Sequence, residues 1–195
     1  MEGTKTLSYE LWEQAGFRAP DNLVVLLGYG SNMLGAERGF DDLLRAGEIA
    51  RRPRLFGVQA ARCAPYAAAF REGVEPLVPT EVAPTVAEGI ATSRPTRVAE
   101  VLRAVRDTGG SIVAVQEAEI VEALRALARQ GLYVEPTSAV AAAGLSRFLA
   151  SGVIRPQEYT VLVLTGSGLK ASATTGELLK LSARPAEEPP HVSRD

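Results

Sequence analysis

Segments of strand length alternate with stretches of helical spacing along most of this 195-residue chain. The apolar run 23–27 and the segments 55–59, 111–115 and 160–164 have the length and composition of strands. Apolar runs without polar alternation indicate strands buried on both faces, as in parallel sheets. Parallel strands need crossover connections, which helices supply. The alternation therefore predicts an α/β fold of three layers, with a mostly parallel sheet flanked by helices.

The segments between the strands predict the rest of the organisation. Helical spacing of apolar residues predicts helices over 4–17, 33–46, 65–70, 95–109, 117–130 and 136–149. Pro95 and Pro136 are expected in the first turns of the helices that they open. The segment 72–95 shows no sustained period and is expected to run over the surface. We expect one domain over residues 1–182 and a loose Pro-rich tail over 183–195.

Composition excludes several classes of function. The formal net charge is -2 and both signs are interspersed, so nucleic acid is not an expected partner. A single cysteine, Cys63, rules out an internal disulfide and is expected to be a small buried residue. No apolar run could span a membrane, no secretion signal opens the chain, and a cytoplasmic setting is the default. No metal-ligand cluster is expected, and the sole histidine, His191, lies in the tail.

A glycine-rich loop follows the first predicted strand, in the order Gly28, Tyr29, Gly30, Ser31 and Asn32. Ligands of open parallel sheets bind beyond the carboxyl ends of the strands, and the helix that follows the loop presents free N–H groups to an anion. A phosphate would be held well there. The loop matches neither the Walker motif nor the dinucleotide fingerprint, and a Gly-x-Gly sequence after a strand is equally often a structural turn.

Two further positions have both a functional and a structural interpretation. Thr165 ends the last predicted strand, where its hydroxyl could donate one hydrogen bond to a neutral ring nitrogen. It could equally satisfy nearby backbone groups. Glu135 precedes Pro136 at a predicted helix start, where an acidic residue is favourable beside the positive end of the helix. Helix capping therefore explains Glu135 without any ligand.

The order of the conspicuous segments resembles the second half of threonine synthases. The matching segments are Glu2–Thr6, the loop 28–32, Gly57–Ala60, Glu88–Ala91, Thr108–Gly110, Glu135–Ala139 and Leu164–Lys170. Threonine synthases belong to the fold type II pyridoxal-phosphate enzymes, together with threonine dehydratase and the tryptophan synthase β subunit. The resemblance implies an incomplete fold of this type, with pyridoxal 5′-phosphate as the cofactor.

The same resemblance assigns roles to the candidate residues. The loop 28–32 matches the segment that binds the cofactor phosphate through backbone N–H groups, and Thr165 matches the hydroxyl residue that faces the pyridine nitrogen. Glu135 matches the acidic residue of the Glu-Pro-x-Ser motif near the cofactor. The chain departs from the family at Tyr29, which could crowd the phosphate, and at Ser167 and Ala171 near the last strand.

The largest departure concerns the lysine that binds the cofactor as a Schiff base. In the family this lysine belongs to a Ser-Phe-Lys-Asp type segment upstream of the matched region, and the 195 residues contain no such segment. The three lysines present are Lys5, Lys170 and Lys180, and none matches that position. The upstream lobe that closes on the substrate is absent as well. We therefore expect non-covalent cofactor binding at most, and no turnover by the chain alone.

The resemblance implies that the intact enzyme converts O-phosphohomoserine and water into threonine and phosphate. Its partners would be the small-molecule amino-acid substrate and a missing amino-terminal portion or further copies of the chain. A dehydratase or β-replacement enzyme is an alternative, because the missing lobe largely reads the substrate. A module that binds phosphate or the cofactor without catalysis is another, and a truncated or degenerate product that folds only partly is a third.

Overall fold

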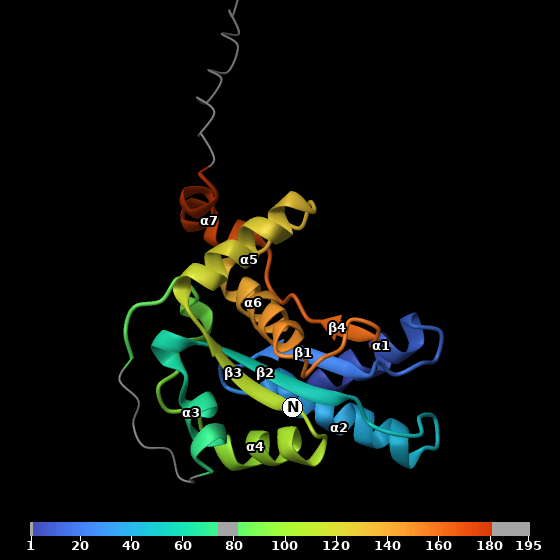
Figure 1. The fold of residues 1–195 in the computed structure, drawn as a ribbon. Coiled ribbons are helices and arrows are strands. Elements are labelled where there is room, and N and C mark those ends of the chain that lie inside the picture. The colour runs from blue at the N-terminus through green and yellow to red at the C-terminus, as the bar shows by residue number, and fades with distance from the viewer. Residues whose placement is uncertain (1, 74–81, 181–195) are drawn as a thin grey trace, which may run out of the picture.

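A computed structural model describes residues 2–73 and 82–180, which form one parallel sheet between two layers of helices (Figure 1). The strands are β1 (Asn22–Leu26), β2 (Arg54–Ala60), β3 (Ser111–Val115) and β4 (Thr160–Leu162). They pair in the order β3-β2-β1-β4, and all three pairings are parallel. The predicted three-layer α/β class is therefore confirmed.

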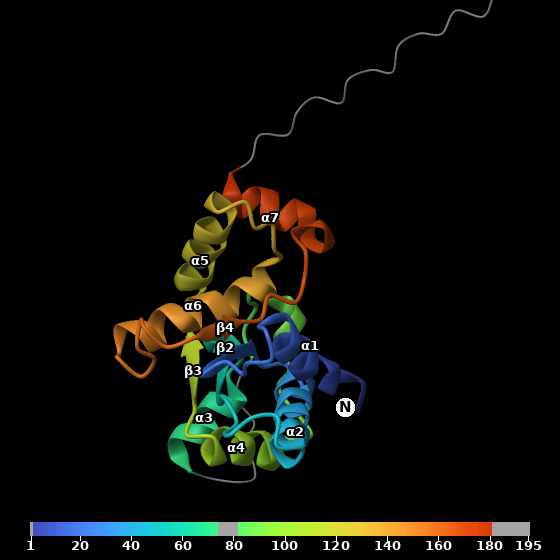
Figure 2. The ribbon, with the colours of Figure 1, turned by 90° about the vertical axis from the view of Figure 1, so that its right-hand side faces the viewer.

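Helices cover both faces of the sheet (Figures 1 and 2). The α-helices are α1 (Thr6–Gln14), α2 (Ser31–Arg45), α3 (Pro65–Glu72), α4 (Val98–Asp107), α5 (Glu117–Arg129), α6 (Pro136–Ala150) and α7 (Ser172–Leu179). Four short 3-10 helices are η1 (Glu2–Lys5), η2 (Ala61–Cys63), η3 (Glu88–Ile90) and η4 (Gly168–Ala171). One face is covered by α2 and α4 with α1 and α3 beside them, and the other by α6 with α5 outside it.

Successive side chains of β1 divide between the two cores. Leu23 and Val25 pack with α2 and α4, whereas Val24 packs with α5 and α6 on the opposite face. All three side chains are at most 1% exposed. This burial on both faces is what the continuous apolar run predicted, because successive strand residues point to opposite sides.

The order of the strands creates a switch point beside β1. The chain steps from β1 to β2 and on to β3 in one direction, and β4 then pairs with the opposite edge of β1. Because all strands are parallel, the loops after β1 and β4 leave the same end of the sheet and diverge. In open α/β sheets a crevice at such a point is the usual place for a ligand.

Three local predictions need correction. The helix expected from Pro95 begins at Val98, since the residue before it, Arg97, has a non-helical φ of -124°. The last strand ends at Leu162, although the N–H of Val163 still donates to the Val24 carbonyl. Helix α7 was not predicted, because only Leu178 and its neighbour form an apolar patch, which packs in the α5–α6 core.

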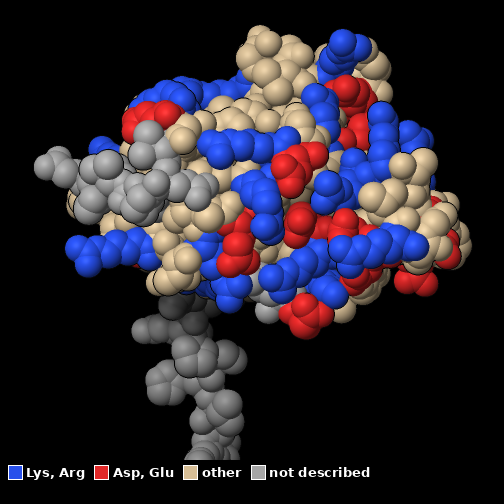
Figure 3. Space-filling view, turned by 90° about the horizontal axis from the view of Figure 1, so that it is seen from below, with Lys and Arg blue, Asp and Glu red and all other residues tan. Residues whose placement is uncertain are grey.

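Other predictions hold or fall outside the described ranges. Cys63 is buried as expected, at 1% exposure. The tail 183–195 and part of the surface excursion 72–95 lie outside the described residues. On the face seen in Figure 3, basic and acidic side chains are interspersed. In the described ranges, no helix has the length and apolar character needed to cross a membrane.

Candidate functional site

A pocket of about 400 Å³ lies at the switch point between the ends of β1 and β4. Its lining residues come from four parts of the chain: Gly3, Thr4, Thr6, Leu7, Glu10, Asn32, Val163 and Thr165. Two of the predicted site residues, Asn32 and Thr165, therefore face one space although 133 positions separate them, as 165 − 32. The parallel pairing of β1 with β4 is the cause of this proximity.

The glycine loop leads directly into α2, and its two glycines are needed for different reasons. Gly30 is the N-cap of α2 with a φ of 80°, a left-handed conformation that glycine adopts without strain. Gly28 lacks a positive φ, but a Cβ there would approach Ile90 Cγ2 to 3.2 Å. No side chain caps α2, whose first turn has no acidic residue. The first N–H groups of α2 are thus available to an anion.

Tyr29 does not fill the loop. Its side chain is 64% exposed, so the crowding suggested by its unusual identity is not seen.

The loop is fastened from below by Gln59, a residue at the end of β2 that is fully buried. Its amide donates to the carbonyl of Leu27 at 3.3 Å, immediately before the loop. Its carbonyl accepts from the N–H groups of Tyr66 at 2.8 Å and Ala67 at 3.1 Å, at the start of α3. One carboxamide therefore connects the ends of β1 and β2 with the first turn of α3.

Tyr66 also lies directly under the loop. A Cβ built on Gly30 would come within 3.1 Å of the Tyr66 hydroxyl and 2.6 Å of Val101 Cγ2. The buried Tyr66 hydroxyl has no hydrogen-bond partner within residues 2–73 and 82–180. Burial, with a smaller contribution from the charge of Glu100, raises the pKa of Tyr66 to about 12, so the phenol is protonated. The space under Gly30 is therefore closed to any side chain.

Thr165 is held at the end of β4 by Ser138, a fully buried residue in the first turn of α6. The Ser138 hydroxyl accepts from Thr165 N–H at 3.1 Å and from Gly166 N–H at 2.8 Å. The two hydroxyl oxygens lie 3.2 Å apart, while the Thr165 residue itself is exposed. The backbone at the strand end is thus fixed, and the Thr165 side chain borders the pocket.

Glu135 lies next to the same strand end. Its N–H donates to the Gly166 carbonyl at 3.0 Å, and its carboxylate occupies the space that a Cβ of Gly166 would need. Glu135 is the N-cap of α6 by position, with Pro136 following it, but its side chain makes no capping hydrogen bond. Capping by the carboxylate, the structural explanation considered from the sequence, is therefore wrong. Glu135 is not among the residues that line the pocket.

Lys5 borders this region through η1, but its amine is occupied by carboxylates. Its Nζ lies 2.8 Å from Asp42 and 2.9 Å from Glu2. Hydrogen bonds to Asp42 and then to Glu2 raise the pKa of Lys5 well above its ordinary value. A protonated amine in two ion pairs cannot act as a nucleophile.

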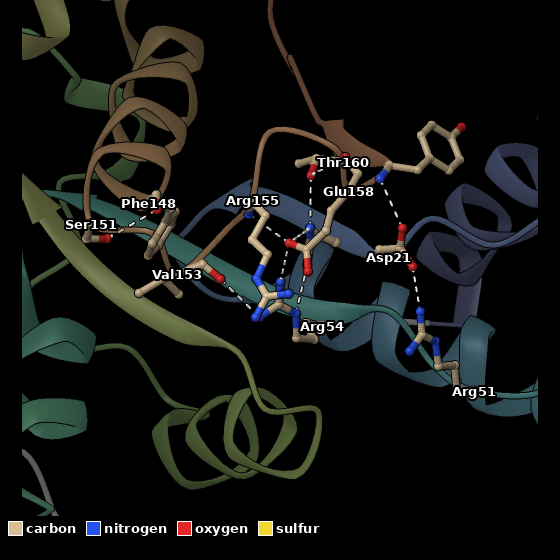
Figure 4. Close-up of polar contacts among 11 residues, drawn as sticks. Asp21, Arg51, Arg54, Phe148, Ser151, Val153, Arg155, Glu158 and Thr160 are labelled. Atoms are coloured by element: carbon tan, nitrogen blue, oxygen red, sulfur yellow. Dashed lines mark hydrogen bonds and ion pairs between the residues drawn. The ribbon is translucent and has the colours of Figure 1, made fainter.

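A larger hollow of about 490 Å³ lies at the opposite, amino-terminal end of the strands, near the residues of Figure 4. Its arginines are already paired: Arg51 with Asp21 at 2.6 Å and Arg54 with Glu158 at 2.7 Å. The arginines therefore neutralise carboxylates of the chain itself, and we place the functional site at the carboxyl end instead. Within the described parts of the chain, no three His, Cys, Asp or Glu side chains gather as they would around a metal ion.

The comparisons with known proteins agree with this placement. The family model described as "Pyridoxal-phosphate dependent enzyme" matches residues 1–166. The threonine synthase of Methanocaldococcus jannaschii is 36% identical over 171 residues, covering 87% of this chain and 42% of that protein. The threonine synthase of Methanosarcina acetivorans is 34% identical over 175 residues, covering 89% and 43%. The chain thus spans less than half the length of these relatives.

Solved structures give the same fold. A threonine deaminase from the organism abbreviated T.th. matches with a TM-score of 0.66 at 25% identity, over 85% of this chain and 57% of that chain. Threonine synthase from Escherichia coli matches with a TM-score of 0.63 at 18% identity, over 86% and 37%. At that identity, the latter shows the fold alone.

The chain belongs to the pyridoxal-phosphate dependent enzymes, and its sheet is part of a fold type II architecture. Within this family it is a partial, threonine synthase-like protein. The family implies pyridoxal phosphate as the cofactor, and the site fits that molecule. An uncapped helix N-terminus suits its phosphate, and a hydroxyl beside the same pocket suits its ring nitrogen.

Proposed function

We propose that residues 1–182 form the cofactor-binding part of a threonine synthase-like enzyme, in which O-phosphohomoserine and water become threonine and phosphate. The observation that carries the proposal is the shared pocket of Asn32 and Thr165 at the switch point. When bound there, the cofactor supplies an electron sink for the charge that develops on the substrate. The chain's own residues would bind and orient it.

Each end of the cofactor would have its own anchor. The loop 28–32 would hold the phosphate through backbone N–H groups, with Gly30 keeping the first turn of α2 open. Thr165 would donate a hydrogen bond to the ring nitrogen from the opposite wall. Glu135 would add negative charge beside the Thr165 strand end, where its carboxylate packs on Gly166.

The chemistry of the lysines supports a chain that is inactive alone. The amine of Lys5 is held by Asp42 and Glu2, with its pKa raised. Lys170 and Lys180 are exposed residues that follow β4 and α7. A Schiff-base lysine must lose its proton in a partly desolvated site, and Lys5 lies in the opposite environment.

The edge of the sheet supports a lysine-bearing amino-terminal portion as the missing partner. In the described ranges β4 pairs with β1 alone, and its residues Thr160–Leu162 are half-buried although two of the three are aliphatic. At the other edge, Arg147 donates to the Ala114 carbonyl of β3 at 2.9 Å. An apolar edge without such a cover is a template for an added strand.

Complementation tests this function. The chain would be mixed with the separately produced amino-terminal part of the Methanocaldococcus jannaschii relative, which the match does not cover, and phosphate and threonine would be measured. We expect turnover only when both polypeptides are present. Thr165→Val should lower it at least tenfold, whereas Thr174→Val, an exposed change on α7, should not. Threonine synthesis by the chain alone would overturn the proposed inactivity.

Two other candidates have observations in their favour. The likeness to threonine deaminase favours a dehydratase, and release of a 2-oxo acid from threonine by the complemented pair would identify it. The occupied Lys5 amine beside a retained glycine loop favours a binding module without catalysis. Reversible uptake of pyridoxal phosphate, no covalent adduct after borohydride reduction and no complementation would identify the module.

A further inference from the structure

The Ser138 hydroxyl is the centre of a small buried network at the end of β4. Its oxygen accepts from the backbone N–H groups of Thr165 and Gly166, at 3.1 and 2.8 Å. It also lies 3.2 Å from the Thr165 hydroxyl and 3.3 Å from the Gly166 carbonyl. Ser138 is fully buried, so water does not share these contacts.

Counting lone pairs fixes the direction of the contact between the two hydroxyls. A hydroxyl oxygen has two lone pairs and one proton. Both lone pairs of Ser138 are taken by amide N–H groups, so Ser138 has no acceptor site left for the proton of Thr165. Ser138 can only donate, either to the Thr165 oxygen or to the Gly166 carbonyl. In both cases the proton of Thr165 is unused by Ser138.

The free proton of Thr165 has the pocket in front of it. Thr165 is exposed and lines the pocket together with Asn32. A hydroxyl that receives from Ser138 and has its own proton free is a donor toward whatever enters. An unprotonated ring nitrogen offers a lone pair to such a donor, whereas a protonated nitrogen presents a second donor in the same place.

We propose that Ser138 is a positioning residue that fixes the Thr165 hydroxyl as a hydrogen-bond donor, so that the site selects a pyridine ring with an unprotonated nitrogen. This inference rests on the proposed cofactor site. It assigns Ser138 a role in the protonation state of the ligand, beyond holding the backbone of the strand end. Without Ser138, the Thr165 hydroxyl is free to rotate and to accept a hydrogen bond from a protonated ring.

The test uses pyridoxine 5′-phosphate labelled with ¹⁵N in its ring, because this ligand has no aldehyde to react with lysines. The ring nitrogen is titrated by NMR in the free and bound states. For the unmodified chain we expect the pKa of the bound ring nitrogen to lie about one unit below that of the free ligand, the effect of one neutral hydrogen bond.

Three variants separate positioning from stability. Ser138→Ala should at least halve the shift, and Thr165→Val should abolish it. Ser146→Ala should leave it unchanged, since Ser146 is an exposed residue of α6 that donates only to the Ala142 carbonyl in its own helix. A Ser138→Ala chain that binds the ligand with the full shift would overturn the proposal.

A measurement without ligand or substitution keeps the proposal testable if Ser138→Ala fails to fold. Neutron diffraction from crystals of the deuterated chain would locate the two hydroxyl deuterons. We expect the Ser138 deuteron on the line to Thr165 or to the Gly166 carbonyl, and the Thr165 deuteron turned toward the pocket. A Thr165 deuteron between the two oxygens would refute the assignment. Absence of ligand binding by the unmodified chain would instead count against the proposed function.

Discussion

The carboxamide of Gln59 donates to the carbonyl of Leu27 across 3.3 Å and thereby joins β2 to the start of the glycine loop. The same side chain accepts from two N–H groups at the start of α3, and all three contacts are buried or nearly so. Replacing it would leave a buried carbonyl and two N–H groups without partners. The geometry of the loop therefore depends on a residue outside the loop.

Gln59→Leu tests this dependence. Leaving buried polar groups unpaired costs about 1–3 kcal/mol each before relaxation, so we expect a total loss of roughly 2–4 kcal/mol in the free energy of unfolding. Urea unfolding measures it. Gln130→Leu is the matched control, because Gln130 is an exposed residue after α5. A loss no larger than that of the control would show that Gln59 does not hold the loop.

Gly30→Ala tests the requirement for glycine in the loop. The φ of 80° costs an alanine about 1–2 kcal/mol, and the new Cβ would meet Val101 at 2.6 Å, which adds about 1–3 kcal/mol of overpacking. We expect lower stability by urea unfolding and weaker binding of pyridoxine 5′-phosphate by titration calorimetry.

Gly47→Ala provides the control for Gly30→Ala. Gly47 has nearly the same φ, 78°, but no atom lies within 4 Å of its would-be Cβ. It should show the conformational cost alone and leave ligand binding unchanged. Equal losses for the two variants would contradict the close packing beneath the loop.

Gly39→Ala tests how the N-terminal wall of the pocket is attached. A Cβ on Gly39 of α2 would lie 2.6 Å from the Lys5 carbonyl and 2.7 Å from Ser8 Cβ, so α1 would have to move. We expect a loss of about 1–3 kcal/mol by urea unfolding, together with weaker ligand binding, since the start of α1 lines the pocket. Gly176→Ala, in an open position on α7, should instead stabilise by about 0.5–1 kcal/mol.

The sheet and the location of the site were predictable because their signals are local. The run 23–27 has the apolar continuity of a buried strand, and the observed β1 differs from it by one residue at each end. The loop 28–32 follows directly, so its place at the carboxyl end of the sheet comes from chain order. Parallel pairing then brings Thr165 to the same end.

The contacts that hold the site were not predictable, because they join residues distant in sequence. Ser138 and Thr165 are 27 positions apart, and Gln59 and Leu27 are 32 apart. From the sequence, Ser138 is one more polar residue at a helix start, and Gln59 is a polar residue at a strand end. Their functions depend on which backbone groups the fold leaves unpaired, and no local pattern encodes this.

The ion pair between Arg54 and Glu158 predicts how stability changes in acid (Figure 4). A hydrogen bond from the Arg155 N–H, aided by Asn22 and Arg54 against a smaller effect of burial, lowers the pKa of Glu158 below its ordinary value of 4.5. A carboxylate whose folded pKa lies below its unfolded pKa stabilises the fold above the unfolded value. That stabilisation is lost as the pH falls through the folded pKa. We therefore expect the difference in unfolding free energy between the unmodified chain and Glu158→Gln to be largest at neutral pH and to shrink below pH 4.5. Urea unfolding at successive pH values measures the difference, with Glu13→Gln on the exposed face of α1 as the control. A difference that stayed constant through the acid range would mean that the charge of Glu158 does not fasten the start of β4 to β2.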